Sequence, residues 1–263
     1  MEGGGAHNGW WWDDTWNTTG GCRPLSPGCL NCYAARAAGT LQTATNNPLH
    51  SDTTVKKRDR HIYTGNLTEL SPGHPNWIDP LRGKGAAELL WVADMSELFL
   101  PERSKEVLDR TIGTLAMSRH HVLILTKLPE QMAAYFNAQP TIIQQRWRKK
   151  FLLGFSAENQ EWFDRRWPPM RALAQQGWYI FVSIAPMIGT VKLPIDLLTL
   201  GKRTWVICSG EQGPSAHVRY MSSTWARGVR DQCADFDVPF FLKQMSGEKP
   251  IPPDLFIREF PAL

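Results

Sequence analysis

Three cysteines near the N-terminus form the densest group of soft metal ligands in the chain. Cys22, Cys29 and Cys32 lie within eleven residues of a stretch that is rich in glycine and proline. Thiolates bind soft metals and iron–sulfur clusters, and a group held by only three protein ligands keeps one coordination position open for chemistry. Cys29-x-x-Cys32 has the spacing at which two thiolates reach one centre. The sequence therefore predicts that these cysteines bind a metal or a cluster.

Two other uses of the cysteine loop stay open from the residues alone. Structural zinc normally has four protein ligands, and the candidate histidines, His7, His50 and His61, have no characteristic spacing. A nucleophilic cysteine is the second alternative, but no histidine stands in a known catalytic signature. The chain has five cysteines, an odd number, so we expect reduced thiols in a cytoplasmic protein. We interpret Cys208 and Cys233 as buried core residues.

Polar side chains follow almost every apolar run in the second part of the chain. Ligands of parallel α/β folds bind beyond the carboxyl ends of the strands, so we expect these residues to converge on one mouth. Helix N-caps also attract Ser, Asp and Asn, and a cap is the alternative for any single one of them. Ionisable groups directly after buried strands are harder to explain as caps, because they need partners that offset desolvation. Such groups are Lys127, Glu211 and Lys243.

The elements that position these residues alternate in a regular way. Apolar runs and amphipathic stretches alternate from residue 89 onward, which is typical of βα units in a parallel sheet or barrel. We expect strands at 89–93, 121–125, 151–155, 178–182, 204–208 and 239–242, and a first strand within 10–17. We expect helices at 101–118, 129–137, 158–175 and 222–237, and one that begins at Tyr33. The predicted fold class is α/β, a partial (β/α) barrel of about six or seven parallel strands.

Length and composition are typical of one globular unit. The chain has 263 residues, 42% of them hydrophobic and 21% charged, and we expect a single domain over 1–263. Residues 40–88 carry no sustained apolar periodicity, so we expect an irregular insertion there with at most one short helix. No apolar stretch approaches 18 residues and no leader pattern is present, so we expect no membrane partner. The 12 tryptophans suit base stacking or, more commonly, core packing.

Several segments resemble a known family. They are similar to the phage-associated three-cysteine-motif family, a group that resembles radical S-adenosylmethionine (radical SAM) enzymes. The similar segments are 16–22 (WNTTGGC), 26–34 (SPGCLNCYA), 94–99 (DMSELF), 125–130 (LTKLPE), 154–160 (GFSAENQ), 210–213 (GEQG) and 238–244 (VPFFLKQ). The resemblance implies a radical-SAM-like partial barrel in which Cys22, Cys29 and Cys32 hold a [4Fe–4S] cluster whose fourth iron binds S-adenosyl-L-methionine. It also implies an external electron donor of the flavodoxin or ferredoxin type, and a 5′-deoxyadenosyl radical that abstracts hydrogen from a substrate.

Under this resemblance the polar residues of the mouth receive roles. Glu211 suits the methionine amine and Lys127 suits its carboxylate, whereas Lys243 is a proton donor or a charge partner of the substrate. The candidate cofactor-binding residues are Tyr33, Asp94, Ser96, Lys127, Ser156, Asn159, Ser183 and Glu211. The candidate catalytic residues are Glu158 and Lys243.

The remaining prediction concerns the substrate. Phage association of similar proteins suggests a nucleic acid or a nucleotide, as in base modification. Basic segments at 56–58 and 146–150 are candidates for phosphate contacts, although a solvated face is the common alternative for a charge run. The competing function class is a non-catalytic module, in which the cysteines hold zinc or a closed cluster and the basic surface binds DNA or a partner protein.

Overall fold

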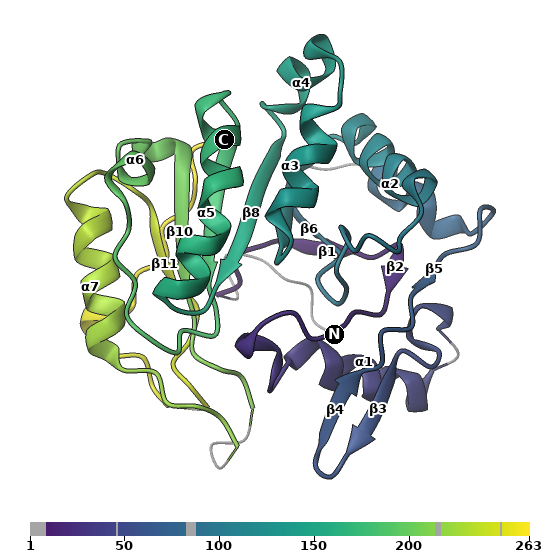
Figure 1. Cartoon of the computed structure of the whole chain (residues 1–263), viewed down its shortest axis with the longest axis horizontal. Coiled ribbons are helices and arrows are strands. Elements are labelled where there is room, and N and C mark those ends of the chain that lie inside the picture. The colour runs from purple at the N-terminus through teal and green to yellow at the C-terminus, as the bar shows by residue number, and fades with distance from the viewer. Residues whose placement is uncertain (1–8, 46, 83–87, 214–216, 248) are drawn as a thin grey trace.

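The centre of the molecule is a seven-stranded parallel sheet. The structure, a computed structural model, describes residues 9–45, 47–82, 88–213, 217–247 and 249–263. The strands are adjacent in the order β1 (Asp14–Trp16), β6 (Leu89–Val92), β7 (His121–Thr126), β8 (Phe151–Ala157), β9 (Tyr179–Ile184), β10 (Thr204–Cys208) and β11 (Phe240–Leu242). The sheet curls into a half-barrel (Figure 1). The expected α/β fold with a curled sheet of six or seven parallel strands is therefore confirmed.

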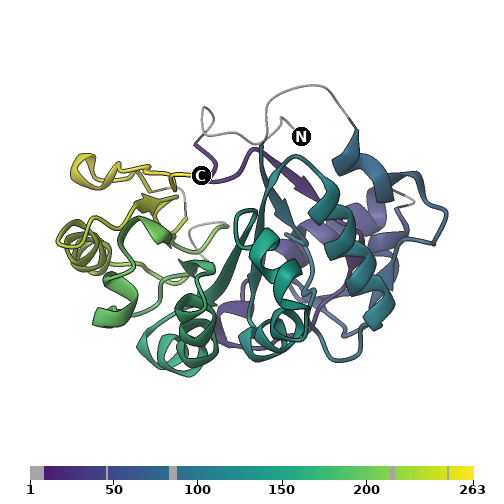
Figure 2. The same cartoon turned by 90° about the horizontal axis from the view of Figure 1, so that it is seen from above.

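The helices that follow the strands from β6 onward lie on the outer side of the curled sheet (Figures 1 and 2). Four of the five expected helices are α2 (Lys105–Met117), α3 (Pro129–Asn137), α5 (Gln160–Gln175) and α7 (Ser223–Ala234). The fifth, α1 (Tyr33–Ala44), begins at Tyr33 as expected. Two short helices, α4 (Thr141–Trp147) and α6 (Ile195–Leu198), were not predicted. α4 buries none of its residues, so it has no apolar stripe to be recognised by. None of the helices in the described part of the chain combines the length and the apolar composition that crossing a membrane requires.

The two faces of the sheet pack against different partners, because side chains alternate along a strand. One set, which includes Phe155, packs with the helices in the larger core cluster. The other set, which includes Phe181 and Phe241, forms a second cluster with Trp11 from the N-terminal segment. Two residues further along, the same rows become polar, with Ser183 after Phe181 and Lys243 after Phe241. Aromatic side chains thus fill the inner face up to the carboxyl ends of the strands, where a polar surface begins.

The segment 40–88 is more regular than we expected. The end of α1 (Tyr33–Ala44) leads to an antiparallel hairpin, and a two-residue strand then pairs with the chain just before the cysteine loop. The further elements are β2 (Thr19–Gly20), β3 (Thr54–Lys57), β4 (Arg60–Tyr63), β5 (Thr68–Glu69) and 3-10 turns at Pro48–His50 and Pro75–Leu81. The hairpin escaped prediction because β3 is mostly exposed and β4 is mostly half-buried, and because its turn uses Arg58 at φ 56° instead of a glycine or asparagine.

Candidate functional site

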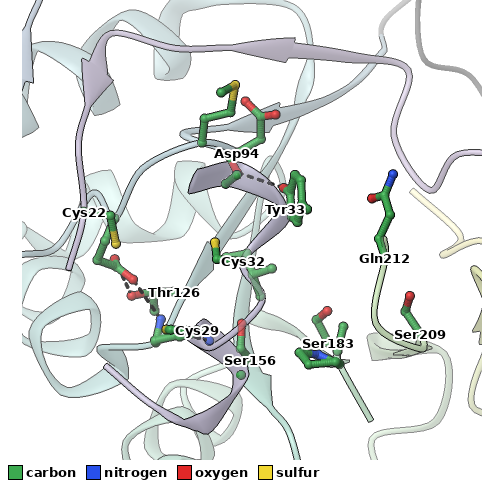
Figure 3. Close-up of a pocket in the computed structure, with 18 of the residues that line it drawn as sticks. Cys22, Cys29, Cys32, Tyr33, Asp94, Thr126, Ser156, Ser183, Ser209 and Gln212 are labelled. Atoms are coloured by element: carbon green, nitrogen blue, oxygen red, sulfur yellow. Dashed lines mark hydrogen bonds between the residues drawn. The ribbon is translucent and has the colours of Figure 1, made fainter. Parts of the chain in front are cut away.

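A cavity at the carboxyl ends of the strands brings most of the predicted site residues together. Its volume is about 190 Å³, far above the roughly 10–15 Å³ that one water molecule needs. Figure 3 shows Cys22 and Cys29 on one side of it and Ser183 and Gln212 on the other. The predicted residues that line it are Cys22, Cys29, Cys32, Tyr33, Asp94, Ser96, Lys127, Ser156, Ser183, Glu211 and Lys243. We call this space the main cavity.

The three cysteines are free thiols in different electrostatic surroundings. Burial raises the pKa of Cys22 and of Cys32, and neighbouring negative groups add to the rise. Burial also opposes ionisation of Cys29, but the Lys127 ammonium and two backbone amides outweigh it and lower the pKa of Cys29. The distance from Lys127 Nζ to Cys29 Sγ is 3.3 Å. Cys29 is therefore the thiol whose surroundings favour the thiolate, the form that binds metals.

Within the described ranges, no group of three or more His, Cys, Asp or Glu side chains is arranged to hold a metal ion. The three cysteines nevertheless line one cavity, and no described histidine lines it with them. Of the histidines considered for zinc, His50 and His61 lie elsewhere, and His7 falls outside the described residues.

Glu158 is the centre of a buried ion network behind the cysteine loop. Its side chain is 0% exposed and accepts hydrogen bonds from Lys127 Nζ at 2.8 Å, from Arg166 Nη1 at 3.1 Å and from the Ser26 hydroxyl. Burial opposes its ionisation, but the two cations hold the pKa of Glu158 below its usual value. A Cβ on Gly28 would lie 2.5 Å from Glu158 Oε1, so the loop packs tightly on this carboxylate. Glu158 does not line the main cavity, so its described contacts are those of a positioning residue, and its catalytic role stays a prediction.

Asn159 also has a different place from the one expected. Its side-chain oxygen accepts a hydrogen bond from the Trp162 amide at 3.1 Å, as the N-cap of α5. It does not line the main cavity. The structure thus shows the helix cap that was the alternative for Asn159, and the cofactor contact stays a prediction.

A second network, around Glu97, was not anticipated. The Glu97 carboxylate accepts hydrogen bonds from the Thr126 hydroxyl at 2.7 Å and from the Lys127 amide at 2.9 Å. Arg103 donates to the carbonyls of Glu97 and Gly20, at 2.8 Å each, so it joins the loop after β6 to the chain that enters the cysteine loop. Glu97 was visible in the sequence as a carboxylate soon after a strand. Nothing local in the sequence indicates the contacts of Arg103.

Residues after β6 are held by short polar contacts at the edge of the main cavity. Tyr33 donates to the Asp94 carbonyl at 2.9 Å, and the Asn17 amide donates to Asp94 Oδ1 at 2.5 Å. Burial raises the pKa of the Asp94 carboxyl and that of the Tyr33 phenol. Ser96 shares a 2.9 Å hydrogen bond with Thr19. Asp94 keeps its second carboxylate oxygen without a described partner, whereas the Ser96 hydroxyl is already engaged.

Glu211 lines the main cavity, but described residues already satisfy its carboxylate. Oε2 accepts hydrogen bonds from Asn31 Nδ2 at 2.8 Å and from the Arg219 amide at 2.7 Å, and the Arg219 guanidinium pairs with Oε1. Burial opposes ionisation, yet these hydrogen bonds lower the pKa of Glu211. Glu211 thus ties the cysteine loop to the chain after β10. Arg219, which the sequence analysis missed, is the partner that makes this tie.

Other polar groups of the main cavity form no hydrogen bond with a described residue. No described residue forms a hydrogen bond with the hydroxyl of Ser156 or Ser183, and both residues are buried. Lys243 Nζ lies 5.0 Å from the Trp10 ring centre, 5.4 Å from Trp12 and 5.6 Å from Tyr33, and it makes no hydrogen bond with a described residue. Burial, opposed by Asp94, lowers the pKa of Lys243 to about 8. These groups are free to bind a ligand.

The two basic segments lie in different parts of the molecule. Residues 146–150 directly precede β8, so they lie at the amino edge of the sheet, while the main cavity lies at the carboxyl edge. Figure 1 shows α4 at the end of β8 that is far from its arrowhead. The segment 56–58 belongs instead to the β3–β4 hairpin, on the cysteine side. Residues 146–150 therefore lie at the opposite edge of the sheet from the main cavity, and their phosphate contacts stay a prediction.

Comparison with known proteins gives one finding. Residues 8–252 match the family described as "Protein of unknown function (DUF5131)". Neither the curated proteins nor the solved structures gave a match.

Proposed function

We propose that this chain, which belongs to the DUF5131 family, is a radical SAM enzyme that acts on a nucleotide or nucleic acid. One observation carries the proposal: three thiols and a set of unpartnered polar groups line one cavity at the carboxyl ends of a parallel half-barrel. Ligands of such folds bind at this edge. A cavity with both soft ligands and free hydrogen-bonding groups suits a metal cluster together with a polar organic molecule.

The three thiols that line the main cavity are the ligands that we propose for a cluster with one open iron position. Cys22, Cys29 and Cys32 would hold a [4Fe–4S] cluster, and Lys127 beside Cys29 offsets part of the negative charge that thiolates bring. When bound, such a cluster supplies the electron that cleaves S-adenosyl-L-methionine to methionine and a 5′-deoxyadenosyl radical. The electron would come from an external donor of the flavodoxin or ferredoxin type.

The residues of the chain would orient and shield this chemistry. The Glu158 network fixes Lys127 and the cysteine loop before any ligand enters, so that no reorganisation is needed. The aromatic cluster around Trp11 closes the floor of the half-barrel against water. Ser156, Ser183 and the free oxygen of Asp94 offer hydrogen bonds to the polar groups of S-adenosylmethionine. Lys243 would hold a proton or pair with a negative charge on the substrate.

The test is a turnover assay under strict anaerobic conditions. Protein reconstituted with iron and sulfide is mixed with dithionite and S-adenosylmethionine, and 5′-deoxyadenosine is measured by chromatography. We expect 5′-deoxyadenosine from the wild-type protein and from Cys233→Ala, a cysteine outside the cavity, but none from Cys29→Ala. A colourless wild-type protein that carries one zinc and yields no 5′-deoxyadenosine would contradict the proposal and favour the non-catalytic module.

A further inference from the structure

A second cavity opens beside the main one, on the side of the β3–β4 hairpin. Its volume is about 130 Å³. Asn31, Cys32 and Gln212 line both cavities, so the two spaces adjoin. The remaining lining residues are Leu30, Arg36, Asp59, Arg60, His61, Gly213, His217 and Val218. We call this space the vestibule.

The two arginines of the vestibule have few partners among the described residues. No described residue forms a hydrogen bond or an ion pair with the Arg36 guanidinium, which lies on the exposed face of α1. The closest acidic partner of Arg60 is Asp59, whose carboxylate lies 3.9 Å from Arg60 Nε and 3.2 Å from His217 Nδ1. The vestibule thus presents two guanidinium groups against one carboxylate that also serves a histidine.

The arginines around the main cavity behave in the opposite way. Arg103 donates to backbone carbonyls, Arg166 pairs with Glu158, and Arg219 pairs with Glu211. An arginine engaged in this way has a structural use within the chain. Arg36 and Arg60 have no comparable use, and a guanidinium matches the oxygen geometry of a phosphate.

We propose that the vestibule binds a phosphate group of the substrate, with Arg36 and Arg60 as its ligands. The proposal rests on the proposed function for the identity of the reaction, but the binding site stands on its own geometry. A phosphate held in the vestibule would leave the rest of a nucleotide pointing toward the main cavity, because the two spaces share Asn31, Cys32 and Gln212. The hairpin of segment 40–88 then has a role in substrate recognition.

The experiment measures binding without turnover. Isothermal titration of the full-length protein uses three probes in turn: inorganic phosphate, a deoxynucleoside monophosphate and a single-stranded oligodeoxynucleotide. We expect both nucleotide probes to bind, and Arg36→Ala and Arg60→Ala each to weaken that binding about tenfold or more. Arg36→Lys should fall between the wild type and Arg36→Ala. For the oligonucleotide, each alanine variant should also reduce the slope of log K against log salt by about one.

The matched control is Arg146→Ala, which removes the same charge from the exposed surface of α4 at the opposite edge of the sheet. If the oligonucleotide binds more tightly than the monophosphate, the phosphate comes from a nucleic acid. If the two bind equally, the phosphate comes from a nucleotide. Either outcome supports the site. Inorganic phosphate that binds as tightly as the nucleotides would show that the phosphate alone supplies the affinity, which also supports the site. Unchanged binding in both alanine variants, or an equal loss in Arg146→Ala, would overturn it. The 5′-deoxyadenosine assay on the same samples separates the two proposals. A variant that loses nucleotide binding but still cleaves S-adenosylmethionine is affected only in the vestibule.

Discussion

The two sides of the main cavity use polar residues in contrasting ways. On the cysteine side, Glu97, Lys127 and Glu158 are joined to other residues of the chain by hydrogen bonds and ion pairs. On the far side, Ser183 and Lys243 form no hydrogen bonds with described residues, although both line the cavity. Figure 3 shows Cys22, Cys29 and Thr126 at one side of this space and Ser183 at the other.

The difference separates support from recognition. Burying a charge costs free energy unless it is paired, so a fully paired side adds rigidity and holds the cysteine loop in place. A buried hydroxyl or ammonium without a hydrogen-bond partner adds no rigidity. Such a group is typical of a place where a ligand supplies the hydrogen bond. The paired side thus fits the cluster, and the open side fits the organic cofactor and the substrate. Variants on each side test this division.

Cys29→Ala tests whether the paired side serves the cluster. Removal of this thiolate leaves two ligands, so we expect iron and sulfide to fall from about four each per chain to background after anaerobic reconstitution. Colorimetric iron and sulfide analysis is the measurement, and Cys233→Ala is the control that keeps the three cavity cysteines. Full iron and sulfide content in Cys29→Ala would mean that the cysteine loop does not hold the cluster.

Glu158→Gln tests how much the paired side depends on its central carboxylate. The variant leaves Lys127 and Arg166 buried without their negative partner, so we expect the free energy of unfolding in urea to fall by about 3–5 kcal/mol. The control is Lys105→Ala, which breaks an ion pair with Asp109 whose lysine is 79% exposed, and which should change stability by less than about 0.5 kcal/mol. Equal effects from the two variants would mean that the buried network is no more important than a surface pair.

Lys243→Met tests how much free energy of unfolding is lost by burying an ammonium that forms no hydrogen bond with a described residue. The pKa of Lys243 is about 8 in the folded chain, below the usual value, so the unfolded chain binds more protons between pH 8 and about 10.5. The wild-type free energy of unfolding should therefore rise through this window relative to the variant, by about 1–3 kcal/mol. Below pH 8 the full cost of the buried charge is present, and Lys243→Met should be the more stable protein. A stability difference that is independent of pH from 7 to 10.5 would contradict the assigned surroundings of Lys243.

Ser183→Ala is expected to change stability little and S-adenosylmethionine binding modestly, in contrast to Thr126→Val on the paired side. Because the Ser183 hydroxyl has no described partner, its loss should leave stability within about 0.5 kcal/mol and weaken S-adenosylmethionine binding about three- to tenfold. Thr126→Val is the matched change on the paired side, where the hydroxyl donates to Glu97. It should cost about 1–3 kcal/mol of stability. Urea unfolding and equilibrium binding of S-adenosylmethionine measure the two quantities, and a stability loss in Ser183→Ala that equals the loss in Thr126→Val would erase the distinction.

Much of the fold was predictable, because apolar runs and amphipathic stretches are local signals. The bounds of β10 (Thr204–Cys208) and α3 (Pro129–Asn137) agree with the predicted ranges. Ser156 and Ser183 were expected after their strands, and they lie within the last two residues of them. The rule that ligands bind at the carboxyl ends of parallel strands then identified most residues of the main cavity.

The partnerships among those residues were not predictable. The contacts of Glu211 with Arg219 and Asn31 depend on three separate loops meeting, and no spacing in the sequence reports such a meeting. Glu158 and Lys127 looked alike as ionisable groups after strands, but one is buried behind the cavity and the other lines it. The vestibule was missed for the same reason, since the hairpin and the chain after β10 are far apart in sequence.

The central claim is that Cys22, Cys29 and Cys32 hold a cluster with one iron open to S-adenosylmethionine. The most direct measurement is electron paramagnetic resonance of the anaerobically reconstituted, dithionite-reduced protein, recorded before and after addition of S-adenosylmethionine. We expect the signal of a reduced [4Fe–4S] cluster, and we expect the shape of this signal to change when S-adenosylmethionine is added. A protein that gives no cluster signal, or a signal that S-adenosylmethionine does not alter, would contradict it.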